Sequence, residues 1–249
     1  MHWLKKRWWV LIIGILFAAV IGFVAWGLMI PEPMPEALAA MQTDSQVTVT
    51  TDPWIVFEPT DQTPTTGLII YPGGRVDPHA YAPIAHAIAA QGYLVVIVPM
   101  PLNLAVLGSD RAAAVIQAYP EIQQWIIGGH SLGGSMAALY ADKHSDQIDG
   151  LALWASYPAS SNDLSDSTIK LTSIYGTRDG LATKDKIDAS RELLPADTTW
   201  VPIEGGNHAQ FGWYGDQPGD NPAQISRQDQ QAQIIQATLD LLQSVENNP

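Results

Sequence analysis

Residues 125–144 read WIIGGHSLGGSMAALYADKH, and their character changes halfway along. Trp125 to Ile127 form a short apolar run that is typical of a buried strand. Four of the next seven residues are glycines, and from Ser135 onward the sequence favours a helix. The stretch therefore predicts a strand, a tight turn and a helix, with Ser131 at the turn.

Gly129 to Gly133 also fit the pattern G-x-S-x-G. In this arrangement the chain turns so sharply that the serine adopts strained backbone angles, and the residues two positions away must be small. The turn places the hydroxyl above the carboxyl edge of a sheet, at the start of the next helix. Ser131 is therefore a candidate nucleophile, and the amide of Leu132 is a candidate donor to an oxyanion.

A serine hydroxyl needs a base that takes its proton, and in this architecture the order along the chain is serine, acid, histidine. Four of the six histidines precede Ser131: His2, His79, His86 and His130. His144 lies 13 residues along the expected helix, roughly 20 Å away at 1.5 Å per residue. His208, in the glycine-rich stretch IEGGNHAQFGW (203–213), is the expected base.

The acid is expected after the strand that precedes the histidine. Asp179 in LTSIYGTRDGLAT (171–183) occupies that place, where a carboxylate would orient the imidazole. Asp163 and Asp166 follow the preceding strand and are the alternatives.

A second oxyanion donor is expected in the loop PGGRVDP (72–78), because glycines let backbone amides approach a ligand. Gly74 is the first choice and Arg75 the second.

Strand-like and helix-like segments alternate through the rest of the chain, which predicts a mostly parallel eight-stranded sheet flanked by helices. Expected strands are residues 47–51, 54–58, 67–71, 94–98, 125–129, 150–154, 170–175 and 199–203, of which the first two form an antiparallel edge. Expected helices are residues 78–91, 109–118, 131–144, 184–193 and 222–245. Only a dozen residues separate Tyr157 from the strand at Lys170, so no cap is expected and the cleft should be open and shallow.

The N-terminal region predicts a membrane anchor. Residues 8–30 carry no charge over 23 positions, more than the roughly 20 needed to cross a bilayer, and Lys5, Lys6 and Arg7 precede them. We expect residues 1–30 to form a cytoplasmic tip and one transmembrane helix, 31–46 a linker, and 47–249 a domain outside the cytoplasmic membrane. A cleaved signal peptide, with the small residues ALAA at 37–40, is the alternative.

Composition and charge exclude several functions. The chain has no cysteine, so disulfides and a cysteine nucleophile are excluded. Beyond Arg7 it carries 25 acidic residues against nine basic ones, which opposes binding to nucleic acid. The spacing of the acids in residues 214–226 fits no calcium loop, and we expect no metal or cofactor.

Residues 47–245 resemble an α/β-hydrolase, and within that superfamily a compact group related to dienelactone hydrolases. The likeness rests on YPGGRVDPHAYAPIA, GGHSLGGSMAA, YGTRDGLAT and EGGNHAQFGWYG. It implies Ser131 as nucleophile, Asp179 as acid, His208 as base and Leu132 as one oxyanion amide. Dienelactone hydrolases use cysteine where this chain has serine, so their lactone substrate is not implied.

The sequence as a whole predicts a membrane-tethered serine hydrolase that cleaves small or surface-presented carboxylic esters. A peptidase, an amidase or an acyltransferase would use the same three residues. A binding module without catalysis is a further alternative, which would have no need of a complete triad.

Overall fold

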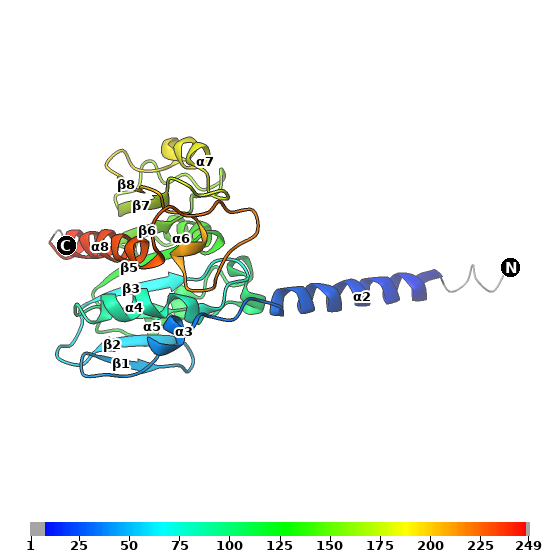
Figure 1. Cartoon of the computed structure of the whole chain (residues 1–249), viewed down its shortest axis with the longest axis horizontal. Coiled ribbons are helices and arrows are strands. Elements are labelled where there is room, and N and C mark those ends of the chain that lie inside the picture. The colour runs from blue at the N-terminus through cyan, green and yellow to red at the C-terminus, as the bar shows by residue number, and fades with distance from the viewer. Residues whose placement is uncertain (1–7, 248–249) are drawn as a thin grey trace.

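The computed structural model describes residues 8–247, and its centre is one eight-stranded sheet (Figure 1). The strands are β1 (Val47–Thr50), β2 (Ile55–Pro59), β3 (Thr66–Tyr71), β4 (Leu94–Ile97), β5 (Gln124–His130), β6 (Gly150–Trp154), β7 (Lys170–Gly176) and β8 (Thr199–Ile203). Their order in the sheet is β1-β2-β4-β3-β5-β6-β7-β8. β1 and β2 pair antiparallel and β2 runs antiparallel to β4, while every other pair is parallel. All eight predicted strands are therefore confirmed, each within two residues of its expected bounds.

Helices cover both faces of the sheet, which explains why the central strands are apolar throughout. In β3, Leu68 and Ile70 belong to a core shared with α4 (Ala82–Ala89) and α8 (Arg227–Glu246). Ile69 and Tyr71 point to the other face, where α5 (Ala112–Ala118) and α6 (Leu132–Lys143) pack. This layering fits the period-2 geometry of a strand buried on both sides.

The helices differ from their predicted bounds at their ends, at the first turn in some and at the last turn in others. The segment expected to be one helix from residue 78 begins as a 3₁₀ turn, η1 (Pro78–Tyr81), before α4. Similarly, α7 (Lys184–Ala189) is followed by η4 (Arg191–Leu193). The last helix begins at Arg227 because the Ser226 hydroxyl accepts a hydrogen bond from the Asp229 amide and so caps it.

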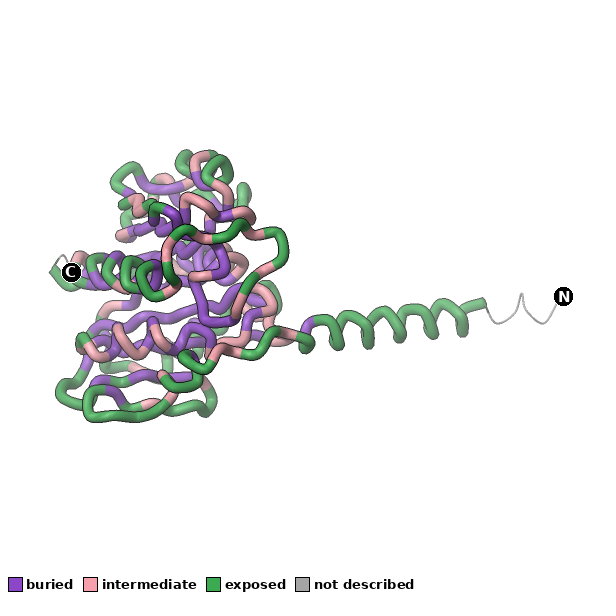
Figure 2. The backbone as a smooth tube through the Cα atoms, viewed as in Figure 1, coloured by how far each residue is buried: buried purple, intermediate pink, exposed green. Residues whose placement is uncertain are grey.

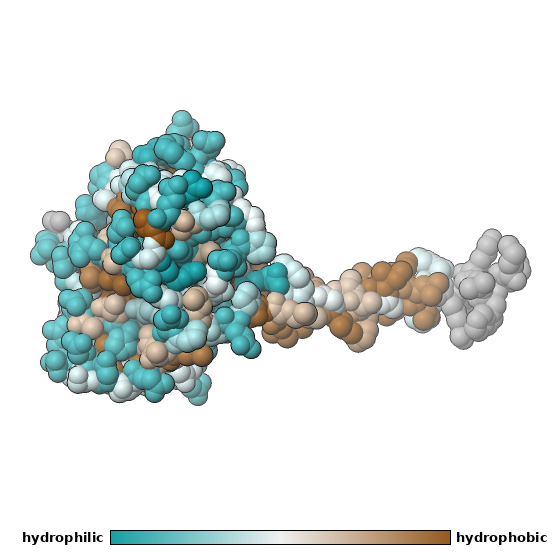
Figure 3. Space-filling view, in the orientation of Figure 1, coloured by the Kyte–Doolittle hydropathy of each residue, from teal (hydrophilic) through white to brown (hydrophobic). Residues whose placement is uncertain are grey.

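An isolated apolar helix, α2 (Trp8–Leu28), precedes the domain. It is long and apolar enough to cross a membrane by length and composition, although a signal sequence meets the same criterion. Figure 2 shows that it is exposed along almost its whole length, and Figure 3 shows its hydrophobic surface projecting from a mostly hydrophilic body. The predicted basic tip, Lys5, Lys6 and Arg7, lies outside the described residues.

The segment expected to be a linker packs on the domain. It contains the short helix α3 (Pro35–Ala39), whose Ala37 is buried beside α4. The Met34 amide donates to the Trp213 carbonyl at 2.8 Å. Residues 31–46 therefore pack on the domain through small apolar side chains such as Ala37. The proline-rich composition of this segment did not predict that packing.

Candidate active site

Ser131 occupies the turn between β5 and α6 with φ 53° and ψ −121°, a left-handed conformation that is costly for a residue with a side chain. Hydrogen bonds from neighbouring segments hold it there. The Ser131 amide donates to the Trp154 carbonyl at 3.0 Å, and the Ser131 carbonyl accepts from the Ser156 hydroxyl at 2.6 Å and from the Ser135 amide at 3.1 Å. The strain is therefore fixed by the end of β6 and the first turn of α6.

The glycines around Ser131 are required by close backbone contact. A Cβ at Gly129 would lie 2.6 Å from the Tyr71 carbonyl oxygen, and one at Gly133 would lie 2.1 Å from the same atom and 2.4 Å from the Pro72 oxygen. These oxygens belong to the end of β3 and the loop after it. Small residues at both positions thus let the turn sit directly on the neighbouring loop.

Replacing Gly133 by alanine is expected to destabilise the domain by about 3 kcal/mol, because the added methyl group meets backbone oxygens that cannot rotate away. The melting temperature should fall by about 6–12 °C for a domain of this size. Gly22→Ala on α2, where an added Cβ meets nothing within 4 Å, is the matched control. Equal thermal melts of the two variants would contradict the close contact.

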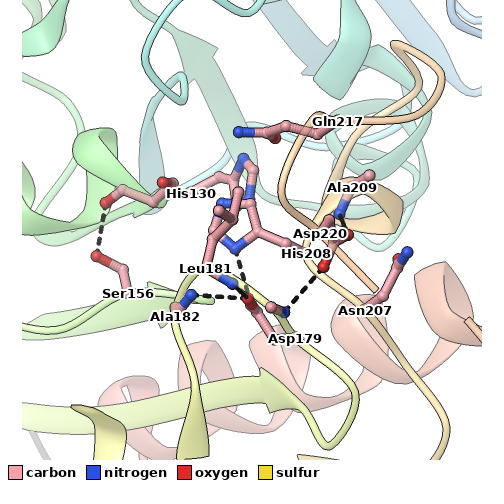
Figure 4. A network of polar contacts seen from close by, with 12 residues as sticks. His130, Ser156, Asp179, Leu181, Ala182, Asn207, His208, Ala209, Gln217 and Asp220 are labelled. Atoms are coloured by element: carbon pink, nitrogen blue, oxygen red, sulfur yellow. Dashed lines mark hydrogen bonds and ion pairs between the residues drawn. The ribbon is translucent and has the colours of Figure 1, made fainter. Parts of the chain in front are cut away.

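His208 and Asp179 form a buried pair at the ends of β8 and β7 (Figure 4). His208 Nδ1 lies 2.7 Å from Asp179 Oδ2, and Asp179 Oδ1 accepts from the amides of Leu181 and Ala182, each at 2.7 Å. An ionised carboxylate can only accept, so the ring donates from Nδ1, and neutral His208 then presents an unprotonated Nε2. Within residues 8–247, this buried Nε2 has no hydrogen-bond partner.

Ser131 and His208 line the same cavity of about 270 Å³, together with Leu132, Tyr157 and Leu181 among others. The described residues show no hydrogen bond between the Ser131 hydroxyl and His208. Such contacts are often long before a substrate binds. The space between the two side chains lies at the carboxyl edge of the sheet, where β5 and β8 end.

The alternative residues lie elsewhere. Asp163 is exposed and its carboxylate accepts from the Ser165 amide. Asp166 also has no contact with His208 among the described residues. His144 stacks on Tyr140 beyond the C-terminal end of α6, with ring centroids 4.3 Å apart. Of the three candidate acids, the fold brings Asp179 to His208.

Asp220 is a supporting residue that sequence reasoning did not identify. Its Oδ1 accepts from the Gly180 amide at 3.0 Å and its Oδ2 from the Ala209 amide at 2.8 Å (Figure 4). One carboxylate thus ties the loop of Asp179 to the loop of His208. The residue belongs to the turn-rich stretch 214–226, whose acids were considered only as calcium ligands, and no local pattern distinguishes it.

The loop after β3 supplies backbone amides near Ser131. A Cβ at Gly74 would lie 3.1 Å from Leu132 Cδ2, so Gly74 sits beside the start of α6. The Arg75 amide already donates to the Asn103 carbonyl at 2.7 Å, and the Gly73 amide donates to the Tyr81 hydroxyl at 2.9 Å. The Gly74 amide has no such partner in the described part of the chain, which favours Gly74 over Arg75 as an oxyanion donor.

A second buried histidine, His130, contacts both this loop and His208. Tyr81 accepts from Gly73, so its hydroxyl hydrogen is available to His130 Nδ1, 2.8 Å away. The ring of His130 packs against the ring of His208, with centroids 4.5 Å apart, and stacks on the ring of Phe211, with centroids 5.6 Å apart. Burial, with a smaller effect of the nearby His208, lowers the pKa of His130 well below its usual range.

The lowered pKa of His130 predicts a loss of stability in acid. The unfolded chain takes up this proton below pH about 6.5 while the folded one does not, so stability is complete above that pH and falls below it. The limiting slope is about 1.4 kcal/mol per pH unit. Thermal melts at pH 6.5 and 5.0 should show a smaller decrease for His130→Gln than for the unmodified protein. Identical decreases would mean that another group controls the acid transition.

A profile described as the alpha/beta hydrolase family matches residues 67–232. No curated protein sequence matches significantly.

Many solved structures share the fold, and three of them are as follows. One, described as a predicted CIB-like hydrolase from Thermoplasma acidophilum, is 15% identical with a TM-score of 0.56, covering 82% of this chain and 100% of its own. Est1E from Butyrivibrio proteoclasticus, described with ferulic acid bound, is 11% identical with a TM-score of 0.57, covering 78% and 98%. MGS-MChE2, an alpha/beta hydrolase enzyme from a lagoon-sediment metagenome, is 16% identical with a TM-score of 0.53, covering 66% and 90%. The family profile spans most of the domain, and the sheet order and the matching structures agree with it: the chain belongs to the alpha/beta hydrolase family.

Proposed function

We propose that the protein is a serine hydrolase that cleaves carboxylic esters with Ser131, His208 and Asp179. The observation that carries the proposal is the buried His208–Asp179 pair, whose remaining ring nitrogen has no other partner within the described residues and whose ring lines one cavity with Ser131. A buried, oriented imidazole beside a serine in a strained turn is the arrangement that activates a hydroxyl.

In the proposed reaction the Ser131 oxygen attacks the ester carbonyl while His208 Nε2 takes its proton. Asp179 holds the ring and stabilises the imidazolium that forms. The amides of Leu132 and Gly74 donate to the oxyanion of the tetrahedral intermediate. His208 then protonates the leaving alcohol, and a water molecule attacks the acyl-enzyme by the same steps to release the acid and restore Ser131.

The ester class is supported by the shape of the site. No helix lies in residues 155–169 between β6 and β7, so no cap covers the cavity on that side. The cavity is open, and its volume of about 270 Å³ suits a small acyl group or a group presented from a surface.

We further propose that α2 remains attached as a single-pass anchor and that the domain lies outside the cytoplasmic membrane. The positive charges of Lys5, Lys6 and Arg7 favour a cytoplasmic N-terminus. The end of α2 is bonded to the domain, as when the Asn103 side-chain amide donates to the Gly27 carbonyl at 3.1 Å, which supports retention over cleavage. Intact mass of the membrane-bound protein distinguishes the two: loss of the first 25–40 residues would establish a signal peptide.

The test of catalysis uses the full-length protein in detergent. Hydrolysis of p-nitrophenyl acetate and butyrate is followed during titration with a fluorophosphonate, and the modified peptide is identified by mass spectrometry. We expect one label per chain on Ser131 and a loss of turnover in proportion to labelling. Labelling of Ser131 without ester turnover would favour an amidase, a peptidase or a transferase. No labelling of the folded protein would overturn the catalytic proposal in favour of a binding module.

A further inference from the structure

The end of α2 is fixed to the domain by several contacts. Arg75 Nε donates to the Trp26 carbonyl at 3.1 Å and Arg75 Nη2 to the Met29 carbonyl at 2.6 Å, while its guanidinium lies 4.4 Å from the centre of the Trp26 ring. Asn103 donates to the Gly27 carbonyl, and Gly27 itself is buried against Leu102. A hinge at this point is opposed by every one of these contacts.

The residues that hold α2 belong to the active-site edge of the sheet. Arg75 lies in the loop after β3, and Leu102 and Asn103 form part of η2 (Pro101–Asn103) after β4. β3 is the direct neighbour of β5, which ends at His130, directly before Ser131. In Figure 1, α2 leaves the body on the side toward which the β3 arrow points, opposite the C-terminus. An anchor leaving from this edge turns the site toward the membrane.

Apolar side chains are exposed beside the same junction. Val106 and Leu107, in η3 (Ala105–Leu107) directly after η2, are 56% and 47% exposed, and Met29 is 73% exposed. We call these three residues the junction patch. Among residues 29–247, the one other exposed large apolar side chain is that of Leu38 on α3, which is 50% exposed. Exposed apolar groups thus gather where the anchor meets the domain.

A second cavity, of about 470 Å³, lies between the anchor and the oxyanion loop. Met29 and Pro31 line one part of it, and Gly74, Arg75 and Tyr214 line another. The space next to the proposed oxyanion donor is therefore bounded by residues that directly follow the apolar helix.

We propose that the junction patch and the active-site edge lie against the bilayer surface, and that the substrates are acyl esters of membrane-resident amphiphiles. This rests on the proposed function. The ester carbonyl would reach Ser131 from the interface while the apolar remainder of the amphiphile stays in the leaflet. The domain is acidic, so contact with an anionic surface depends on apolar side chains and on the anchor rather than on charge.

Bilayer contact is tested without reference to activity. Because the chain has no cysteine, Val106→Cys in the full-length protein can be labelled at one site with an NBD fluorophore and placed in phosphatidylcholine nanodiscs. We expect blue-shifted emission and quenching by brominated lipids. Asp146→Cys, exposed before β6 at the opposite edge of the sheet, is the control and should show neither. Equal behaviour of the two probes would overturn the proposed orientation.

The substrate class is tested by comparing a fluorogenic acyl ester embedded in the same bilayer with soluble p-nitrophenyl acetate. The measured quantity is the ratio of the two turnover rates. We expect this ratio to fall about tenfold in Val106→Ser/Leu107→Ser and to stay unchanged in the matched variant Leu38→Ser. An unchanged ratio in the double variant would overturn the inference and leave the proposed function intact. Turnover of neither ester would overturn the proposed function and the substrate class, while the fluorescence result would still decide the orientation.

Discussion

Replacing Ser131 by alanine is expected to lower kcat for p-nitrophenyl butyrate by about 10⁶-fold, the scale seen when a serine nucleophile is removed from a complete triad. The loss follows from the proposed mechanism, because without the hydroxyl no acyl-enzyme can form. The free energy of unfolding should not fall. Alanine, like serine, carries a Cβ and is no more strained at φ 53°, and the hydrogen bonds to the backbone of the turn remain. Fluorophosphonate labelling should disappear together with turnover.

Ser145→Ala, which changes an exposed serine just beyond α6, is the matched control and should retain both signals. If Ser131→Ala kept more than about one per cent of the activity, far above what the oxyanion amides alone supply, another nucleophile would have to be sought.

Replacing Asp179 by asparagine is expected to lower kcat by about 10⁴-fold with the fold intact. Asparagine retains an oxygen for the amides of Leu181 and Ala182, but its NH₂ group then faces His208 Nδ1. An NH₂ group donates, so the ring becomes the acceptor at Nδ1 and carries its proton on Nε2. In that tautomer His208 cannot take a proton from Ser131.

The control is Asp163→Asn, which changes the exposed alternative acid and should leave kcat unaltered. Circular dichroism and thermal melts of both variants establish that they fold. A loss of activity in Asp163→Asn but not in Asp179→Asn would reverse the assignment of the acid.

The features that could be predicted from the sequence are those that depend on local patterns of residues. The eight strands follow from apolar runs bounded by turn residues, and Ser131 follows from a motif whose glycines are dictated by contacts within a few ångströms. Asp179 and His208 follow from the order serine, acid, histidine and from their places after two expected strands. Parallel strands end at one edge of the sheet, so residues 29 positions apart can meet there.

The rest of the site depends on contacts between segments that no local pattern connects. Asp220 bonds two loops through backbone amides, which any residue could offer. Tyr81 makes hydrogen bonds with both Gly73 and His130, although His130 lies 49 positions further along the chain. The packing of α3 and of the end of α2 on the domain likewise depends on contacts with residues far away in the sequence, such as Trp213 and Arg75.

The hydrogen bonds between Arg75 and the end of α2 limit where the chain can be shortened without disturbing the domain. A soluble fragment beginning near Pro31 would leave the Arg75 guanidinium, in the residue next to Gly74, without its two carbonyl acceptors. It would also uncover Leu102 in η2, against which Gly27 packs. In this sense α2 is a structural part of the surroundings of the loop after β3. Exchanging it for an unrelated helix, in the laboratory or in evolution, would require the new helix to end in carbonyl groups placed for the same arginine.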